Sequence, residues 1–323
     1  MTTALVHDPL CKRHDPGPRH PEVPARYDAA VAGARAAGPV SEPAPRIGTE
    51  EDVLRIHTAD YLRIVKEDVA DPVGALRTGD TDVCAWSLDA ALRAVGCALT
   101  AVDLVMDGAA ANAFCPVRPP GHHATANRGM GFCVFNNIAV AARHLRQRRG
   151  VDRVLIVDWD VHHGNGTQAI FERDPSVFYF STHQWPLYPG SGQRHEAGVG
   201  EGRGHTVNCP LAAGCGVSDL LDRIRSRLAP VMRTFRPQFV LLSAGFDGHG
   251  RDPIGGLCLR DEDYGALTGA VAELAAEHAD GRLVSLLEGG YHLEALERSV
   301  AAHAGALLRA GGEEPGMAGG DNA

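Results

Sequence analysis

The sequence predicts an α/β fold built on a mainly parallel central sheet, and three observations support this prediction. Short apolar segments rich in β-branched residues alternate with helical segments along most of the 323 residues, which is the pattern of successive β-α-β units. Segments such as 154–157 and 239–242 are apolar throughout, as expected for strands that are buried on both faces. Polar residues follow several of these segments directly, at the end of parallel strands where α/β proteins bind their ligands.

Length and composition are typical of one globular domain, and we expect residues 1–323 to form a single domain. Hydrophobic residues make up 44% of the chain and charged residues 22%, which is sufficient for a substantial core. No linker-like segment divides the chain, and the Gly-rich stretch 311–323 is expected to be a disordered tail. The net charge of −9 provides no basic surface for nucleic acid or for an anionic membrane.

Targeting signals and cysteine usage favour a cytoplasmic protein. The first residues, MTTALVHDPL, lack the basic and apolar regions of a signal peptide, and no run reaches the roughly 18 apolar residues of a membrane span. The 8 cysteines are scattered without a C-x-x-C pair, so we expect reduced and mostly buried thiols.

In the first half of the chain, helical segments predominate between two short strands. A first strand at 5–6 is followed by a loop rich in proline, histidine and charge, and strand 112–116 leads into the loop RPPGHHATANRGMGF. Ser87 is expected to cap an apolar helix over 88–106. The other predicted helices cover 25–37, 51–56 and 59–67, and a loop rich in glycine and aspartate covers 71–82.

In the second half, strands and helices alternate regularly. The predicted strands cover 154–157, 177–180, 205–208, 239–243 and 283–287. The predicted helices cover 136–149, 164–172, 217–235, 261–278 and 292–308. A long irregular loop, 183–204, carries aromatic side chains and little regular structure.

A dense polar cluster follows the strand at 154–157. Asp158, Asp160 and His162 are spaced by two, so their side chains point to one side if the extended backbone continues. Carboxylate and imidazole together suit zinc or a neighbouring first-row metal. An isolated Asp-x-His is equally typical of a solvated strand end, and the motif alone leaves both interpretations open.

Three further strand ends also carry polar residues: His122 with His123, Asp247, and Tyr291. Taken singly, the histidine pair is typical of a core or capping position, and the tyrosine is typical of packing. Because the carboxyl ends of parallel strands meet at one edge of the sheet, the four groups together predict a hydrolytic site. With Asp247 as the third ligand, the metal site would have the open position of catalytic zinc.

The blocks RPPGHHA, GFCVFNN, VLIVDWDVHHGNGTQ, YPGSG, LLSAGFDGHGRDPIGG and LEGGYH, preceded by HPEVPAR, occur in this order over nearly the whole chain. They resemble the histone deacetylase family, and in particular its class II branch and the bacterial histone deacetylase-like amidohydrolases. The resemblance implies the arginase/deacetylase fold, a three-layer αβα arrangement with a mainly parallel sheet of roughly eight strands.

The resemblance also implies roles for particular residues of this sequence. One Zn²⁺ would be held by Asp160, His162 and Asp247. The catalytic groups would be His122, His123, Tyr291, Asp158, which orients His122, and Asn165, which stands where class I relatives carry a second aspartate. A structural K⁺ would be held by Asp158, Ser181 and backbone oxygens of Asp160, His162 and Thr182. The substrate tunnel would include Gly131, Phe132, Tyr188, Ile254 and Gly290, with Arg26 near the acetate exit.

The implied activity is zinc-dependent removal of acetyl or other acyl groups from lysine side chains, with release of acetate. The implied partner is an acylated lysine peptide or protein, or an acylated small amine. Two alternatives stay open, an acetylpolyamine amidohydrolase and a weakly active acyl-lysine binding module. Ile254 stands at the rim of the implied tunnel, where the polyamine-specific class II relative carries a glutamate. An aliphatic residue there favours acyl-lysine substrates, unless Asp80, Asp82 or Glu22 makes the rim negative. A homo-oligomer is left open.

Overall fold

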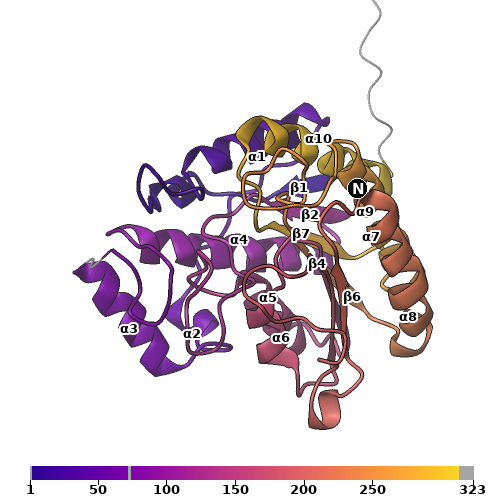
Figure 1. Ribbon diagram of the computed structural model, residues 1–323, viewed down its shortest axis with the longest axis horizontal. Helices are drawn as coiled ribbons and strands as arrows, with labels where there is room; N and C mark the ends of the chain where they lie inside the picture. Colours follow the sequence, from indigo (N-terminus) through magenta and orange to yellow (C-terminus); the bar gives the residue numbers. More distant parts are fainter. Residues whose placement is uncertain (1, 72–73, 313–323) are drawn as a thin grey trace, which may run out of the picture.

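A parallel sheet of seven strands lies at the centre of the protein, which the computed structural model describes over residues 2–71 and 74–312 (Figure 1). The strand order is β1-β2-β7-β6-β3-β4-β5, and every pair of neighbouring strands is parallel. The strands are β1 (Thr3–Leu5), β2 (Asn112–Cys115), β3 (Val154–Asp158), β4 (Val177–Gln184), β5 (Thr206–Leu211), β6 (Phe239–Ala244) and β7 (Leu283–Leu287).

The strand number implied by the resemblance, roughly eight, differs from the seven that form in the described residues. Beside the edge strand β1, the segment at Ser41 makes only one isolated parallel bridge, with Ala4. Pro43 and Pro45 follow this bridge, and proline has no N–H to continue a ladder. The chain therefore leaves the sheet edge after a single pairing.

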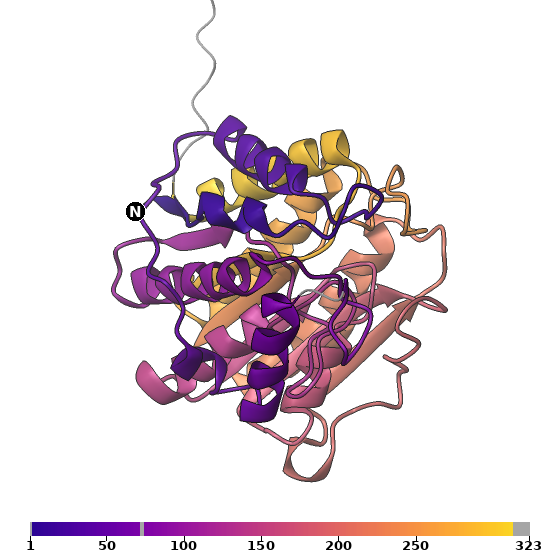
Figure 2. The same ribbon diagram turned by 90° about the vertical axis from the view of Figure 1, so that its left-hand side faces the viewer.

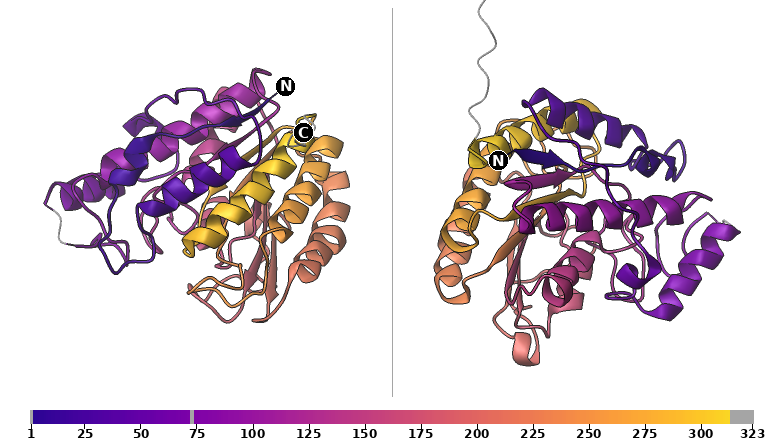
Figure 3. Two further views of the ribbon diagram at one scale, coloured as in Figure 1. Left: turned by 90° about the horizontal axis from the view of Figure 1, so that it is seen from above. Right: turned by 180° about the vertical axis from the view of Figure 1, so that it is seen from behind.

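Helices cover both faces of the sheet, as the α/β pattern predicts. They are α1 (Ala25–Ala36), α2 (Glu50–Val53), α3 (Ala59–Ala70), α4 (Ser87–Met106), α5 (Asn137–Arg148), α6 (Asn165–Phe171), α7 (Val217–Arg223), α8 (Ala229–Phe235), α9 (Asp263–His278) and α10 (Leu293–Ala310). Two 3₁₀ turns, η1 (Pro9–Arg13) and η2 (Gly200–Gly202), and one π-helical turn, η3 (Ile224–Leu228), complete the described elements. On one face α1, α10 and α9 pack in a row (Figure 3); on the other, α2 and α3 lie against α4 and its neighbour α5 (Figure 2).

Two separate apolar cores on the two faces make the molecule three-layered. In β3, Leu155 and Val157 belong to the core beneath α1, α9 and α10, whereas Val154 and Ile156 belong to the core beneath α4 and α5. Side chains alternate between the faces of a strand, so a strand covered on both sides must be apolar at every position. The three-layer αβα architecture is confirmed.

Several element boundaries differ from the sequence prediction. Ser87 is the first residue of α4 rather than its cap; its hydroxyl accepts the Cys84 N–H and lies 2.8 Å from Nδ1 of His14. The helix expected at 217–235 is divided by the π-helical turn η3. Gly311 and Gly312 continue the end of α10 through backbone hydrogen bonds, while the rest of the predicted tail, 313–323, lies outside the described residues.

Two predictions from composition can be compared with the described residues. No helix among them is long and apolar enough to cross a membrane. All cysteines are free, and 5 of the 8 are buried, as expected for reduced thiols; Cys258 is exposed.

Candidate active site

The loops that follow β2, β7, β6 and β3 meet at one edge of the sheet. These four strands are consecutive neighbours in the sheet, although they are far apart in the sequence. The strand order therefore brings together the four groups that the sequence analysis selected, as expected for the carboxyl edge of a parallel sheet.

Asp160, His162 and Asp247 form a buried cluster whose ligand atoms all lie within 4.8 Å of one another. Nδ1 of His162 is 3.0 Å from Oδ1 of Asp160 and 3.1 Å from Oδ2 of Asp247. Backbone N–H groups hold the other carboxylate oxygens: Gly289 donates to Asp160 and Val161 donates to Asp247. The three side chains are thus fixed with one ligand atom each facing a common point.

The charges in this cluster favour a bound cation. Burial and the negative charge of Asp160 raise the pKa of Asp247 to about 7. Burial alone would lower the pKa of His162, but hydrogen bonds to Asp160 and Asp247 raise it to about 10. Two buried carboxylates facing one imidazole are stabilised by positive charge placed between them. Two carboxylates, one imidazole and a free fourth position fit a catalytic zinc ion.

Glycine at 289 is required by close packing against this cluster. A Cβ atom there would lie 2.1 Å from Oδ2 of Asp247 and 2.6 Å from Oδ2 of Asp160. Any side chain at this position would displace the carboxylates. The first of the two glycines in LEGGYH is therefore needed for steric reasons at the candidate metal site.

His122 and His123 lie beside the candidate metal cluster, with ring centroids 4.0 Å apart and ring planes tilted by 43°. Nδ1 of His122 donates to Oδ2 of Asp158 at 3.0 Å, and Nδ1 of His123 lies 2.8 Å from Oδ1 of Asn165. Burial alone would lower the pKa of His122, but the carboxylates of Asp158, Asp160 and Glu288 raise it well above the usual value. Burial and the positive charges of His122 and His162 hold the pKa of His123 well below its usual value.

Asp158 links the histidine pair to the sheet. Its Oδ2 accepts the Tyr179 hydroxyl as well as His122, and its Oδ1 accepts the Asp160 N–H. Asp158 is in register with Ser181 on β4, and Thr182 follows Ser181 on the same strand. The side chains expected to hold K⁺ therefore lie on neighbouring strands, and the presence of the ion stays a prediction.

A recess of about 300 Å³ leads from the surface to His123 and His162. The predicted tunnel residues Gly131, Phe132, Tyr188 and Ile254 line it; Gly290 does not. The other lining residues are Asp80, His123, His162, Leu187 and Tyr291. The recess is thus lined mostly by aromatic or aliphatic side chains, and His123 and His162 bring the polar cluster into contact with it.

One wall of this recess needs glycine at 131. Gly131 and Phe132 both have positive φ, 57° and 68°, and a Cβ on Gly131 would lie 2.3 Å from Cδ2 of His123. Asp80 holds the wall by accepting the Gly131 N–H at 2.8 Å and the Tyr188 hydroxyl at 3.3 Å. Asp80 thus supports this wall of the recess.

Tyr291 and Ile254 are positioned by one buried carboxylate that the sequence analysis missed. Asp252 accepts the Tyr291 N–H through Oδ2 and the Ile254 N–H through Oδ1. The Phe132 ring stands edge-on to the Tyr291 ring, with centroids 5.9 Å apart. The guanidinium of Arg26 lies 4.7 Å from the centre of the same ring.

Arg26 lies beneath the site, fully buried, and donates to the carbonyls of Gly290 and Glu288. Glu22, which the sequence analysis considered as a rim carboxylate, is also fully buried and pairs with Arg26 and Arg118. Two arginines satisfy this carboxylate, so it contributes nothing to the rim. HPEVPAR and RPPGHHA therefore meet through an ion-pair cluster that spacing along the chain does not reveal.

Glu288 is a second functional position that the sequence analysis did not select. It is fully buried; Oε2 accepts the N–H groups of Gly121 and His122, and Oε1 accepts the Ser243 hydroxyl. Burial raises its pKa to about 7. The contacts join β6 and β7 to the loop that carries the histidine pair. The glutamate of LEGGYH, directly after an apolar strand, is the signal that could have identified it.

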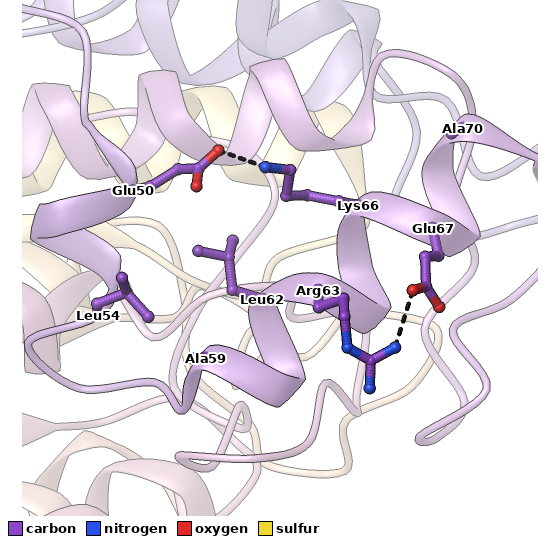
Figure 4. Close-up of a pocket in the computed structure, with 8 residues that line it drawn as sticks. All are labelled: Glu50, Leu54, Ala59, Leu62, Arg63, Lys66, Glu67 and Ala70. Carbon is purple, nitrogen blue, oxygen red and sulfur yellow. Dashed lines mark hydrogen bonds and ion pairs between the residues drawn. The ribbon is translucent and has the colours of Figure 1, made fainter.

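Another recess lies between α2 and α3, and none of the candidate site residues lines it (Figure 4). Its rim carries the ion pairs Glu50–Lys66 and Arg63–Glu67, and its floor is formed by Leu54, Leu62 and alanines. The charged side chains of this recess are paired with one another. Among the described residues the cluster of metal-type ligands lies at Asp160, His162 and Asp247 instead, so the chemistry is expected at the sheet edge.

A family model described as the histone deacetylase domain matches residues 20–307. The chain belongs to the histone deacetylase family. A probable deacetylase of Archaeoglobus fulgidus is 40% identical over 91% of this chain and 82% of its own length. The histone deacetylase-like amidohydrolase of Pseudomonas aeruginosa is 40% identical over 75% of this chain and 64% of its own length.

A human relative and a solved structure extend the comparison. The polyamine deacetylase HDAC10 of Homo sapiens is 40% identical over 81% of this chain and 40% of its own length. The crystal structure of the HDA15 HD domain superposes with a TM-score of 0.89 and 34% identity, covering 97% of this chain and 90% of that one. The predicted family and arginase/deacetylase fold are confirmed, and with them a deacetylase-family hydrolase.

Proposed function

We propose that this protein is a zinc-dependent deacetylase that removes acetyl groups from lysine side chains and releases acetate. One observation carries the proposal: two adjacent histidines with opposite protonation tendencies border a three-ligand metal cluster in contact with the recess. Groups whose pKa values are driven apart by their surroundings are suited to separate acid and base roles.

Asp160, His162 and Asp247 would hold one zinc ion. When bound, zinc supplies a Lewis acid that polarises the amide carbonyl and lowers the pKa of water. The donor set fits, because two buried carboxylates and one imidazole converge on one point and leave room for a further ligand.

His123 would act as the general base. With Oδ1 of Asn165 accepting from Nδ1, the proton of the neutral ring sits on Nδ1, and Nε2 is free to take a proton from water. The low pKa of His123 keeps the ring neutral at physiological pH. The same Nε2 would then give this proton to the leaving amine.

His122 and Tyr291 would stabilise negative charge. His122 is held in its protonated form by Asp158, Asp160 and Glu288, so it supplies a fixed positive charge beside the reacting amide. The hydroxyl of Tyr291 would donate a hydrogen bond to the carbonyl oxygen as it becomes negative, which is the type of contact that lowers a barrier most.

The recess would select a linear, unbranched amine chain. Its walls are formed by Phe132, Tyr188, Leu187 and Ile254, which can desolvate the methylene groups of an acetyl-lysine side chain. The aliphatic Ile254 at the mouth offers no charge to a polyamine, and this favours an acylated lysine in a peptide or protein.

An acetylpolyamine amidohydrolase is the second candidate, and one observation favours it. The carboxylate of Asp80, which is exposed, also lines the recess and can attract a cationic substrate. The relative named a polyamine deacetylase keeps this class open. We also propose that Asp158, Ser181 and backbone oxygens of Asp160, His162 and Thr182 hold a structural K⁺ ion.

The test compares kcat/KM for an acetyl-lysine peptide and for acetylspermidine. We expect wild type to prefer the peptide and Ile254→Glu to shift the preference towards acetylspermidine by about tenfold, or about 1.4 kcal/mol of transition-state discrimination. Ile254→Gln is the matched control, because it adds a side chain of the same shape without charge.

Two outcomes would contradict the proposal. A tenfold preference of wild type for acetylspermidine would identify the polyamine enzyme instead. Tight binding of acylated amines without any turnover would identify an acyl-lysine binding module.

A further inference from the structure

A small recess lined by three arginines lies away from the deacetylase site, at the opposite edge strand of the sheet from β1. Its lining residues are Arg194, Asn208, Cys209, Arg223 and Arg227. They come from three segments: the irregular loop after β4, the edge strand β5, and the helical stretch α7–η3. The volume is about 40 Å³, which is enough for one small polyatomic ion.

The three arginine side chains line the same recess, together with the side chain of Cys209. Burial raises the pKa of the Cys209 thiol, the positive charges of Arg227, Arg223 and Arg194 act to lower it, and the negative charge of Asp222 has the smallest effect, in the opposite direction. Arg223 and Arg227 are four residues apart across the start of the π-helical turn, a spacing that places side chains on one side of a helix. Arg194 approaches from the facing loop.

These positive charges are poorly neutralised. Among the described residues, Arg194 and Arg227 form no ion pair with a carboxylate, and Arg223 pairs only with its neighbour Asp222, at 3.1 Å. Nε of Arg223 is buried and has no hydrogen-bond partner. Three convergent cations repel one another, and a buried donor without an acceptor is costly. The chain as a whole is acidic, with a net charge of −9, but no carboxylate is among the residues that line this recess.

We propose that this recess is a binding site for a phosphate-type oxyanion, supplied either as inorganic phosphate or as the terminal phosphate of a small phosphomonoester. Planar guanidinium groups donate pairs of parallel N–H bonds to such oxygens. The small volume admits one phosphate group, with any attached group left in solvent. This site is independent of the proposed deacetylase activity.

The test is calorimetric titration of the full chain with inorganic phosphate, against chloride of equal ionic strength. Wild type is expected to bind one phosphate per chain, and Arg227→Gln to weaken the affinity at least tenfold. Arg225→Gln is the matched control: Arg225 lies on the same π-helical turn and is exposed, but it does not line the recess. Its affinity is expected to stay within twofold of wild type.

A parallel titration with a phosphorylated sugar distinguishes the two sources. Binding of both ligands, each lost in Arg227→Gln, identifies recognition of a terminal phosphate; binding of inorganic phosphate alone identifies an enclosed free anion. The proposal is overturned if wild type shows no saturable phosphate binding, or if Arg225→Gln loses as much affinity as Arg227→Gln. Both arginine side chains are at the surface, so thermal unfolding of each variant checks that the fold is retained.

Discussion

Two adjacent histidines in this site have opposite charge preferences because their neighbours differ. His122 faces Asp158, Asp160 and Glu288, whereas His123 faces the neutral amide of Asn165 and two cationic rings. The same type of side chain is thereby prepared for two tasks within one pair of adjacent rings. Charge placement around an imidazole, rather than the imidazole itself, sets its role.

At the residue scale, the first prediction concerns Tyr291. Tyr291→Phe removes only a hydroxyl that would bond to the reacting oxygen, so kcat should fall about a hundredfold or more, while KM changes little. Steady-state kinetics on an acetyl-lysine peptide measure this split. Tyr188→Phe is the control, because its hydroxyl bonds to Asp80 at the tunnel wall. Equal losses in the two variants would show that Tyr291 acts only through packing.

The second prediction concerns Glu288, whose carboxylate satisfies two backbone N–H groups in the interior. Glu288→Ala leaves these donors unpaired beside a cavity and should lower the free energy of unfolding by about 2 to 5 kcal/mol. Glu288→Gln retains an oxygen acceptor and should recover most of this loss. Denaturant unfolding measures both variants. Equal destabilisation by Ala and Gln would mean that the negative charge, rather than hydrogen bonding, is what matters.

The metal ligands, the histidine pair and Tyr291 could be selected from the sequence because each follows a recognisable apolar strand or a Gly-rich turn. Glu288, Asp252 and the Glu22–Arg118 pair could not be assigned roles. Glu288 contacts residues 166 and 167 positions away, and Glu22 contacts Arg118 at a separation of 96. No local pattern records contacts of this range. Glu22 was considered, with Asp80 and Asp82, as a carboxylate that could make the rim of the site negative, whereas it is fully buried.

At the element scale, a hydrogen bond to His57, in the loop between α2 and α3, holds the start of α5. Nε2 of His57 accepts the N–H of Asn136, and the Asn136 side chain caps α5 by accepting the Ala139 N–H. Burial lowers the pKa of His57 to about 4. A protonated ring could no longer accept this bond, so the neutral form is the one compatible with the cap.

This arrangement predicts a pH-dependent stability. The folded pKa of about 4 lies below the unfolded value of about 6.5, so the unfolded state takes up the proton first. Stability is therefore present above about pH 6.5 and is lost as pH falls towards 4, by about 2 kcal/mol at pH 5. In His57→Gln, where the amide oxygen can still accept, the free energy of unfolding should fall less between pH 7.5 and 5. An unchanged difference between these two pH values would contradict the prediction.

Element prediction succeeded where pattern and packing agree. The strand at 283–287 was predicted with its observed bounds, because four of its five residues are apolar and strands buried on both faces are mostly apolar. The π-helical turn within 217–235 was missed, since the buried side chains there recur every four residues, at Leu220, Ile224, Leu228 and Met232, and an α-helix shows the same spacing. The family resemblance predicted roughly eight strands, but next to β1 the chain forms only a single bridge, at Ser41. The prolines that follow prevent further pairing at this edge of the sheet.

At the scale of the whole molecule, the strand order explains why the site is built from distant segments. β2, β7, β6 and β3 are neighbours in the sheet, so their carboxyl ends deliver the histidine pair, Tyr291, Asp247 and Asp160 to one place. The fold class, the family and the edge of the sheet could be predicted from the sequence. Strand order cannot be read from periodicity, and the cytoplasmic location, the oligomeric state and the K⁺ ion stay predictions.

The most direct test of the account measures deacetylation of an acetyl-lysine peptide together with bound metal, in protein stripped by chelation and then titrated with zinc. We expect turnover to rise in proportion to bound zinc and to saturate at about one ion per chain, since three protein ligands with an open position define a catalytic site. Asp247→Asn should bind zinc weakly and show little turnover at the same zinc concentration. Full turnover in the metal-free protein, or activity that requires two manganese ions per chain, would contradict the account.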